Sequence, residues 1–420
     1  MIGRCCFAGQ MPGRSLAFLL KSHSRTLSTS SAPTVWIISA GDVAGDKQAM
    51  ALATIGQLGK PIKKNIVPSK RISWLYPVFQ KIIMDRRTNK LEKSEQFDKL
   101  RQLQPLPWYL ESPSNDVLSE PLPDYVISSC PSTTLAALQV KAASRGATKA
   151  IHLQQPFVNM EVYDALVIQK HLWPLLALSS NLSRSGSVIG TKLCLNGITS
   201  EALEQAARNE SVLPAAFYLP DKESPIFAVL ISAMHNINFT WFSDETRRLV
   251  QQLDRLYRVH NARIAMTFTR KTPETVRGAI RQWAESVQDS ERVYLWDGTG
   301  ENPYETMLAR ATHIAVTADS MMMTSEALMC RKPVYIIGTN KCKSDLQKFH
   351  KSLVVAGHAR PFLPSRLPPD VDLDFGVVME ENSEGEDPFS DIGDHKSWQW
   401  WRENETADAG RAIREMLSSK

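Results

Sequence analysis

The sequence lacks any run of about 18 apolar residues, the length that a membrane-spanning helix requires. It also lacks a C-x-x-C pair, because its six cysteines are dispersed along the chain. They are Cys5, Cys6, Cys130, Cys194, Cys330 and Cys342. Such spacing argues against a zinc site and against the disulfide framework of a small secreted protein. No Ser-His-Asp order, carboxylate pair or metal-ligand constellation stands out, so the sequence nominates no catalytic residue and no metal site.

Acidic residues are absent from the first 41 residues, which are rich in Ser and Thr and contain four basic residues. These are Arg4, Arg14, Lys21 and Arg25. A basic, hydroxylated, acid-free start predicts a mitochondrial presequence over residues 1–33, with a disordered tail as the alternative. Removing four positive charges lowers the net charge from +5 to +1, so the mature chain offers no charge argument for nucleic acid binding.

Apolar strands and helical patterns alternate over residues 34–200, which predicts an N-terminal Rossmann-like domain. The expected strands are 35–39, 125–129, 150–154, 165–169 and 187–194, and the expected helices are 48–58 and 131–145. A polar stretch at 85–123, with a solvated helix at 91–103, is interpreted as an insertion.

A second series predicts a C-terminal Rossmann-like domain over residues 226–366. Its expected strands are 227–232, 264–269, 293–296 and 313–317, and its expected helices are 244–257, 273–287 and 321–330. With 43% apolar residues, 420 residues suffice for two cores. The predicted fold is therefore α/β, with two such domains facing a cleft where ligands bind outside the carboxyl ends of the strands.

The end of the chain changes character. An acidic linker is expected at 367–395, because residues 367–394 contain ten acidic and no basic residues. A helical pattern then starts with Trp398, Trp400 and Trp401 within residues 396–420. These tryptophans are either packing anchors or a partner-binding patch.

Two strand-to-helix turns are candidate ligand sites. At the first, Gly41, Asp42 and Gly45 let a phosphate or sugar approach the backbone, or else form a tight capped turn. At the second, Asp319 and Ser320 precede a helix whose backbone N–H groups would stabilise an anion.

The segment Gly300–Tyr335 carries a family resemblance through four motifs. They are GENPY at 300–304, VTADS at 316–320, SEA at 325–327 and KPVY at 332–335. The segment resembles GT-B glycosyltransferase-like proteins, and more closely the mitochondrial fission "elongated mitochondria" family. Weaker counterparts are TFTRKTPE at 267–274 and AGDVAGDKQ at 40–48.

The resemblance implies a GT-B-like fold with a C-terminal crossover helix, and it assigns Glu326 to a nucleotide ribose. Ser320 and the backbone at 319–322 would hold a phosphate, with Arg270 and Lys271 adding positive charge. Asn302, within GENPY, is a further ligand candidate.

Two departures weaken an enzymatic interpretation. Arg331 stands where the family has glycine, and the loop 232–236 lacks the family's glycines. Both predict a crowded donor site. His152, His171, His235 and His313 are candidate bases by residue type only, and a lone histidine is more often structural.

Two functions remain open on the sequence alone. One is a mitochondrial protein that affects organelle shape through protein contacts, because plant relatives help to recruit a dynamin-related GTPase. The other is a metal-independent glycosyltransferase with a nucleotide-sugar ligand and no other cofactor. A cleavable presequence leads to the matrix, where a cytosolic dynamin is not met.

Overall fold

Parallel strands alternate with helices along most of the chain. The computed structural model describes residues 32–93, 103, 105–172, 187–219, 224–362, 389, 392 and 397–418. Within Pro33–Lys420, the described strands form two six-stranded parallel sheets and one two-stranded antiparallel pair. This confirms the predicted α/β fold with two Rossmann-like domains. The presequence and almost all of the acidic linker lie outside the described residues.

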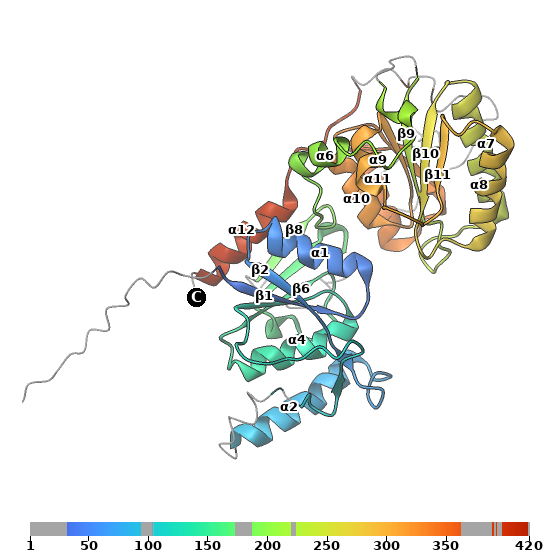
Figure 1. Cartoon of the computed structure of the whole chain (residues 1–420). Helices are drawn as coiled ribbons and strands as arrows, with labels where there is room; N and C mark the ends of the chain where they lie inside the picture. The colour runs from blue at the N-terminus through green and yellow to red at the C-terminus, as the bar shows by residue number, and fades with distance from the viewer. Residues whose placement is uncertain are drawn as a thin grey trace, which may run out of the picture. The chain divides into compact units, whose positions relative to one another are not determined.

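The first sheet has the strand order β2-β1-β5-β6-β7-β8. The strands are β1 (Thr34–Ser39), β2 (Lys60–Asn65), β5 (Tyr125–Ser128), β6 (Lys149–Leu153), β7 (Ala165–Gln169) and β8 (Val188–Thr191). Figure 1 shows helices α1 (Val43–Thr54) and α12 (Glu405–Ser418) over one face, and α4 (Pro131–Ala143) over the other. The central strands are short apolar runs because both faces are buried.

The second sheet has the order β11-β10-β9-β12-β13-β14. The strands are β9 (Ile226–Ile231), β10 (Arg263–Phe268), β11 (Val293–Trp296), β12 (His313–Thr317), β13 (Val334–Ile337) and β14 (Arg360–Pro361). Helices α7 (Ser243–Arg258) and α8 (Glu274–Val287) cover one face. Helices α9 (Tyr304–Arg310), α10 (Met321–Met329) and α11 (Ser344–Val355) lie on the other face (Figure 1).

The last helix crosses back to the first sheet, as the resemblance implies. Ala409 and Ile413 of α12 are buried in the same core cluster as Leu52 of α1. Gly410 lies so close to Gly56 that an added Cβ would stand 2.1 Å from the Gly56 carbonyl oxygen. The Glu405 carboxylate accepts hydrogen bonds from the backbone N–H groups of Lys192 and Leu193, each at 2.7 Å.

The helix α12 begins later than predicted, at Glu405, and the tryptophans precede it. Trp398 and Trp401 are buried in the core of the second sheet, and Trp398 lies edge-on to Tyr335 with ring centroids 5.4 Å apart. Of the two alternatives, the packing-anchor interpretation therefore holds for these two residues.

The polar stretch also differs from expectation. It begins within helix α2 (Pro77–Lys93), which was not predicted and packs on α4. Most of the helix predicted at 91–103 lies outside the described residues. A short antiparallel pair lies on either side of α2 in the sequence, formed by β3 (Val67–Pro68) and β4 (Leu110–Glu111). Helix α6 (Ser200–Ala207) lies in the connection between the two sheets.

Candidate functional site

Each sheet has a point where the chain reverses its direction of travel across the strand order. In the second sheet this point lies between β9 and β12, whose neighbours in sequence run to opposite sides. Ligands of open α/β sheets bind outside the carboxyl ends of the strands at such a point. The residues at these two carboxyl ends are 232–234 and 318–320. The candidate turn at Asp319 and Ser320 therefore lies where open α/β sheets bind their ligands.

The backbone N–H groups of the loop after β9, which faces this turn, are already bonded to protein oxygens. Asp319 accepts hydrogen bonds from Ala233 N at 3.2 Å and Met234 N at 2.9 Å. Thr317 Oγ1 accepts from Ser232 N at 2.9 Å and from Ala233 N at 3.3 Å. Burial raises the pKa of the Asp319 carboxyl, while the bonds from the loop oppose that shift. An incoming phosphate would therefore have to displace Asp319.

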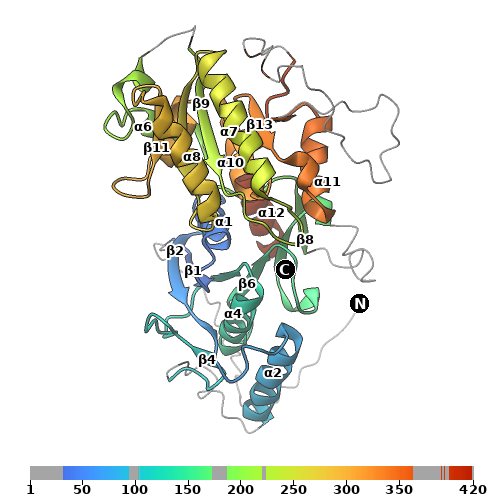
Figure 2. The ribbon, with the colours of Figure 1, turned by 90° about the vertical axis from the view of Figure 1, so that its right-hand side faces the viewer.

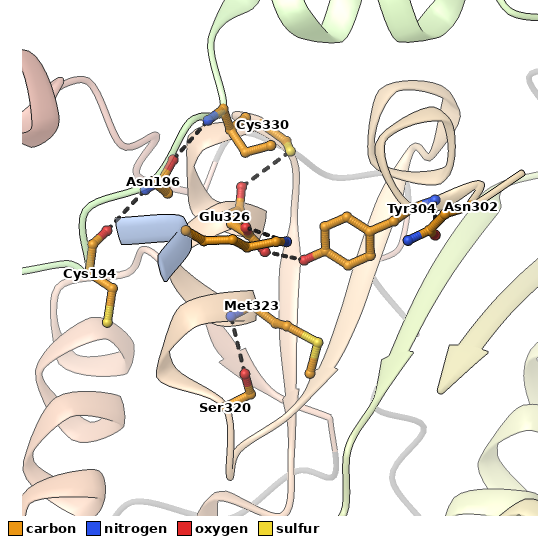
Figure 3. A network of polar contacts seen from close by, with 10 residues as sticks. Cys194, Asn196, Asn302, Tyr304, Ser320, Met323, Glu326 and Cys330 are labelled. Atoms are coloured by element: carbon orange, nitrogen blue, oxygen red, sulfur yellow. Dashed lines mark hydrogen bonds and ion pairs between the residues drawn. The ribbon is translucent and has the colours of Figure 1, made fainter. Parts of the chain in front are cut away.

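Ser320 is the N-cap of α10. Its Oγ accepts a hydrogen bond from Met323 N at 3.2 Å, and its carbonyl accepts one from Thr324 Oγ1 at 3.0 Å (Figure 3). A cap of this type satisfies one of the unpaired N–H groups of the first helical turn. The side chain thus begins the helix, and the predicted contact with a phosphate stays a prediction.

Glu326 is buried, and its carboxylate binds the Tyr304 hydroxyl and the exposed Lys47 ammonium. Its carboxylate accepts a hydrogen bond from the Tyr304 hydroxyl of α9 through one oxygen (Figure 3). The other oxygen lies 3.3 Å from the Lys47 ammonium of α1. Lys47 also lies over the Tyr304 ring, 5.0 Å from its centroid. Burial, and next the Glu326 charge, raise the pKa of the Tyr304 hydroxyl well above its usual value, so it stays a hydrogen-bond donor.

Sequence reasoning selected Glu326 but missed both of its partners. Lys47 and Tyr304 each stand inside a motif that carried the family resemblance, AGDVAGDKQ and GENPY. The residue beside Glu326 is also engaged, because Ser325 Oγ accepts from Cys194 N at 3.0 Å. Helix α10 is therefore held from three directions by α1, α9 and the segment after β8.

The first candidate turn is closed by its own residues. Asp42 is the N-cap of α1, and its carboxylate accepts from Gly45 N at 3.1 Å. Gly41 has a φ of +81°, which favours glycine. A Cβ at Gly45 would lie 2.4 Å from Ser129 Oγ. The glycine at 45 thus allows close packing of α1 against the end of β5, which agrees with the tight capped turn expected as one alternative from the sequence.

The remaining candidates lie at the same edge of the second sheet but are not part of the Glu326 cluster. Arg270 and Lys271 are exposed in the turn after β10, which neighbours β9. Buried Thr272 anchors this turn by donating to the Ile231 carbonyl at 2.9 Å. Asn302 is exposed, and its Oδ1 accepts from Tyr304 N at 3.1 Å.

The four histidines named by type have structural surroundings. His152 is buried, bonded to Ser128 Oγ at 2.8 Å, and burial lowers its pKa to about 4. Burial likewise lowers the pKa of His171 to about 4. His235 Nδ1 accepts from Trp241 N at 3.2 Å, and His313 lies between Thr312 Oγ1 and the Ile392 carbonyl, each at 2.8 Å. A histidine that stays neutral by burial is a poor proton acceptor at neutral pH.

The expectation that Arg331 crowds the donor site is wrong. Arg331 follows the C-cap of α10 and precedes β13, whereas the candidate turn adjoins the other end of that helix. Its φ of +54° lies in the left-handed region, and its side chain is exposed. Glycine is usual at such a position because it ends a helix without a Cβ penalty. The loop 232–236, the second departure from the family, does adjoin the candidate turn. Its Ala233 has a φ of +50°, so the backbone there is in the left-handed region that glycine favours although no glycine is present.

A small cavity lies elsewhere in the second domain. Its volume is about 20 Å³, and Trp241, Glu245, Gly338 and Phe362 are among the residues that line it. Such a space holds about one water molecule. It is too small for a nucleotide sugar.

The fold and sequence both match known proteins. The structure is similar to that of UDP-GlcNAc 2-epimerase from Methanocaldococcus jannaschii, with a TM-score of 0.50 and 11% identity over 92% of this chain and 99% of that chain. At that identity the likeness shows the fold, which is GT-B-like. No described helix is long and apolar enough to cross a bilayer.

Two relatives are similar in sequence over part of their length. The Arabidopsis thaliana "Mitochondrial fission protein ELM1" is 32% identical over 157 residues, which cover 37% of this chain and 30% of that protein. An uncharacterized Rickettsia prowazekii protein, RP120, is 24% identical over 246 residues, covering 53% of this chain and 66% of that protein. The matches thus span less than two thirds of either relative. The profile of the family described as Mitochondrial fission ELM1 matches residues 45–417, and the chain belongs to this family.

Proposed function

We propose that this chain acts at mitochondria, in mitochondrial division or shape, through contacts with other proteins, and that its GT-B-like fold is a scaffold without sugar transfer. The observation that carries the proposal is that the Asp319 carboxylate accepts hydrogen bonds from the backbone N–H groups of Ala233 and Met234. A nucleotide diphosphate would need those groups, and the Asp319 carboxylate, 2.9 Å from Met234 N, would repel an anion there.

The Glu326 cluster supports the same conclusion. In GT-B transferases an acidic residue at this position accepts hydrogen bonds from the nucleotide ribose. Here Tyr304 and Lys47 each bind one of the two carboxylate oxygens. A ribose would have to compete with both, at the cost of leaving a buried donor without its acceptor.

The mitochondrial part of the proposal has two supports. The name of the Arabidopsis relative refers to mitochondrial fission. The basic, acid-free residues 1–31 are typical of a presequence, although they lie outside the described residues. A fusion of these residues to a fluorescent protein is expected to enter mitochondria, and a cytosolic fusion would contradict the location.

The test of the scaffold role measures nucleotide-sugar binding and organelle shape on the same variants. We expect UDP-GlcNAc titrated into the full chain to give no saturable heat and no release of UDP. The double variant Arg270→Ala/Lys271→Ala removes two exposed cations near the carboxyl edge without touching the core. In cells that lack the endogenous protein, it should restore mitochondrial shape as well as the parent does. UDP release by the parent that the double variant loses would overturn the proposal.

The second candidate function is binding of a nucleotide-activated sugar. It is favoured by those same cations, because a diphosphate is stabilised by Arg and Lys at a strand-to-helix turn. The structural neighbour is named for UDP-GlcNAc chemistry. Ser320→Ala, with Ser325→Ala as a control on the same helix, separates the candidates: only the first should weaken binding if Ser320 holds a phosphate.

A further inference from the structure

Exposed apolar side chains are concentrated in one segment of the first domain. Of the sixteen large apolar residues that are exposed in the described part of the chain, five fall between residues 74 and 82. They are Trp74, Tyr76, Val78, Phe79 and Ile82. Trp74 is 78% exposed, Tyr76 68% and Phe79 56%. Single exposed apolar residues are ordinary, whereas a contiguous group of this kind marks an interaction surface.

Helix α2 has two distinct faces. Pro77, Gln80 and Met84 are buried, and Figures 1 and 2 both show α2 on the far side of α4 from the first sheet. The outward face follows the helical repeat. It is apolar at its start, through Val78, Phe79 and Ile82, and basic further along, through Arg86, Lys90 and Lys93. We call these six residues, with Trp74 and Tyr76, the α2 face.

The α2 face is held in place by the core beneath it. Gln80 Nε2 donates to the Leu75 carbonyl at 2.8 Å and to the Ile72 carbonyl at 3.3 Å. Ile72 and Met84 belong to the core cluster under α4. The indole N–H of Trp74 donates to the Arg71 carbonyl at 3.0 Å, so the exposed ring has its polar group satisfied. The apolar residues are therefore presented outward by an anchored backbone.

The charge of this segment is strongly one-sided. Residues 69–93 contain seven basic and two acidic residues, a net charge of +5. The whole chain also has a net charge of +5, so all the other residues together sum to zero. The two acidic residues of the segment are Asp85, whose carboxylate lies 2.5 Å from the Lys81 ammonium, and Glu92.

We propose that the α2 face binds the surface of a bilayer that contains anionic phospholipid. Trp74, Tyr76, Phe79 and Ile82 would enter the boundary between headgroups and acyl chains, and the basic end of α2 would contact headgroup phosphates. Trp and Tyr favour that boundary because their rings are apolar and their tips are polar. A protein interface fits less well, because lysines are depleted from the centres of such interfaces. The surface does not depend on the proposed function, since it shares no residue with the Glu326 cluster.

The experiment is flotation of the full chain with two kinds of vesicle, one of phosphatidylcholine alone and one with added phosphatidylglycerol. We expect the chain to float only with the anionic vesicles. The variant Trp74→Ser/Phe79→Ser should lower the bound-to-unbound ratio by at least about tenfold, because both rings leave the bilayer boundary. Its matched control is Ile237→Ser/Phe242→Ser, which removes two exposed apolar side chains from the second domain. The control should float as the parent does.

A charge variant tests the basic end. Lys90→Glu/Lys93→Glu should lower the ratio by about fivefold for each basic residue lost near the surface. Arg402→Glu/Lys343→Glu changes the net charge equally at exposed positions elsewhere and should have little effect. Thermal unfolding of each variant checks that it is folded. Equal flotation of the parent and the α2 variants would overturn the proposal, as would a dimer of the parent that forms without vesicles and is lost in Trp74→Ser/Phe79→Ser.

Discussion

The turns at the two switch points use the same strand-turn-helix plan but are closed in different ways. In the first domain Asp42 caps Gly45 three residues away, and glycine lets α1 pack against Ser129. In the second domain the loop after β9 has no glycine, and Asp319 reaches it from 86 residues further along the chain. The first turn is thus a local structure, whereas the second depends on a long-range contact. The motif alone does not make an anion site, because the groups already bonded to its N–H donors decide what it can bind.

The largest expected effect comes from breaking the second turn. Asp319→Ala leaves Met234 N without its acceptor and Ala233 N with only the bond to Thr317 Oγ1, and we expect a loss of about 2–4 kcal/mol in the free energy of unfolding. Urea unfolding measures it. Phosphate should recover part of the loss in the variant and none in the parent, because the anion replaces the carboxylate. Asp297→Ala, which removes the acceptor of one exposed turn N–H, should cost less than about 1 kcal/mol. Equal losses in both variants would contradict this account.

Acid should weaken both domains, because burial keeps His152 and His171 neutral in the first and His350 neutral in the second. Burial lowers the pKa of His152 in the first domain and of His350 in the second to about 4. A lowered folded pKa means that the stabilisation is complete above about 6.5 and is lost as pH falls towards 4. Each histidine should contribute a slope of about 1.4 kcal/mol per pH unit in this window.

The matching variant is His350→Gln, which can still donate to the Ala318 carbonyl that His350 now contacts. The free energy of unfolding, measured from pH 6.5 to 4.5, should fall less steeply with pH in this variant than in the parent. The difference in slope should be the contribution of one histidine. His152→Gln should do the same for the first domain. A slope that neither variant changes would mean that other groups control the acid response.

Breaking the first turn should have a smaller effect. Gly45→Ala places a Cβ 2.4 Å from Ser129 Oγ and 2.7 Å from Asp42 Oδ2, and we expect a cost of about 1–3 kcal/mol from the displaced neighbours. Ser129→Gly in the same chain should restore part of it. Gly41→Ala meets no atom within 4 Å and loses only the freedom of its positive φ, about 1 kcal/mol. A greater loss from Gly41→Ala than from Gly45→Ala would reverse this ranking.

The smallest effect tests whether glycine itself is the missing feature of the second turn. Arg331→Gly should raise stability by about 0.5–1 kcal/mol, because it relieves a left-handed backbone at an exposed position. Ala233→Gly should change stability little, because the loss of a buried methyl offsets that gain. Calorimetry should detect no phosphate binding by Ala233→Gly while Asp319 remains. Binding after this one change would show that glycine, and not the carboxylate, controls the site.

The sequence predicted the buried parts of the fold well, because a central parallel strand is an apolar run. Ala165–Gln169 and His313–Thr317, both fully buried, were predicted with their observed bounds. The edge strand β2, Lys60–Asn65, was missed because its half-exposed residues KPIKKN have no apolar run. Helix α2 was missed because its outward face starts apolar, which hides the helical repeat of a solvated helix.

The sequence motifs located the candidate site, but they did not show which groups its residues contact. The sequence led to Asp319, Ser320 and Glu326, yet nothing in it shows which atom each carboxylate contacts. Lys47 lies 279 residues from Glu326, so only the folded chain brings the two together. Arg331 was misjudged although the helix predicted at 321–330 already separates it from the VTADS turn.

The C-terminal helix has a consequence for the order in which the molecule can be made. The ribosome synthesises α12 long after β1, but Ala409 and Ile413 of α12 complete the core on the α1 face of the first sheet. Domains generally fold as they emerge, and here the first sheet must wait until α12 has been translated. A premature stop within Glu405–Ser418 would therefore damage the half of the molecule that was translated first.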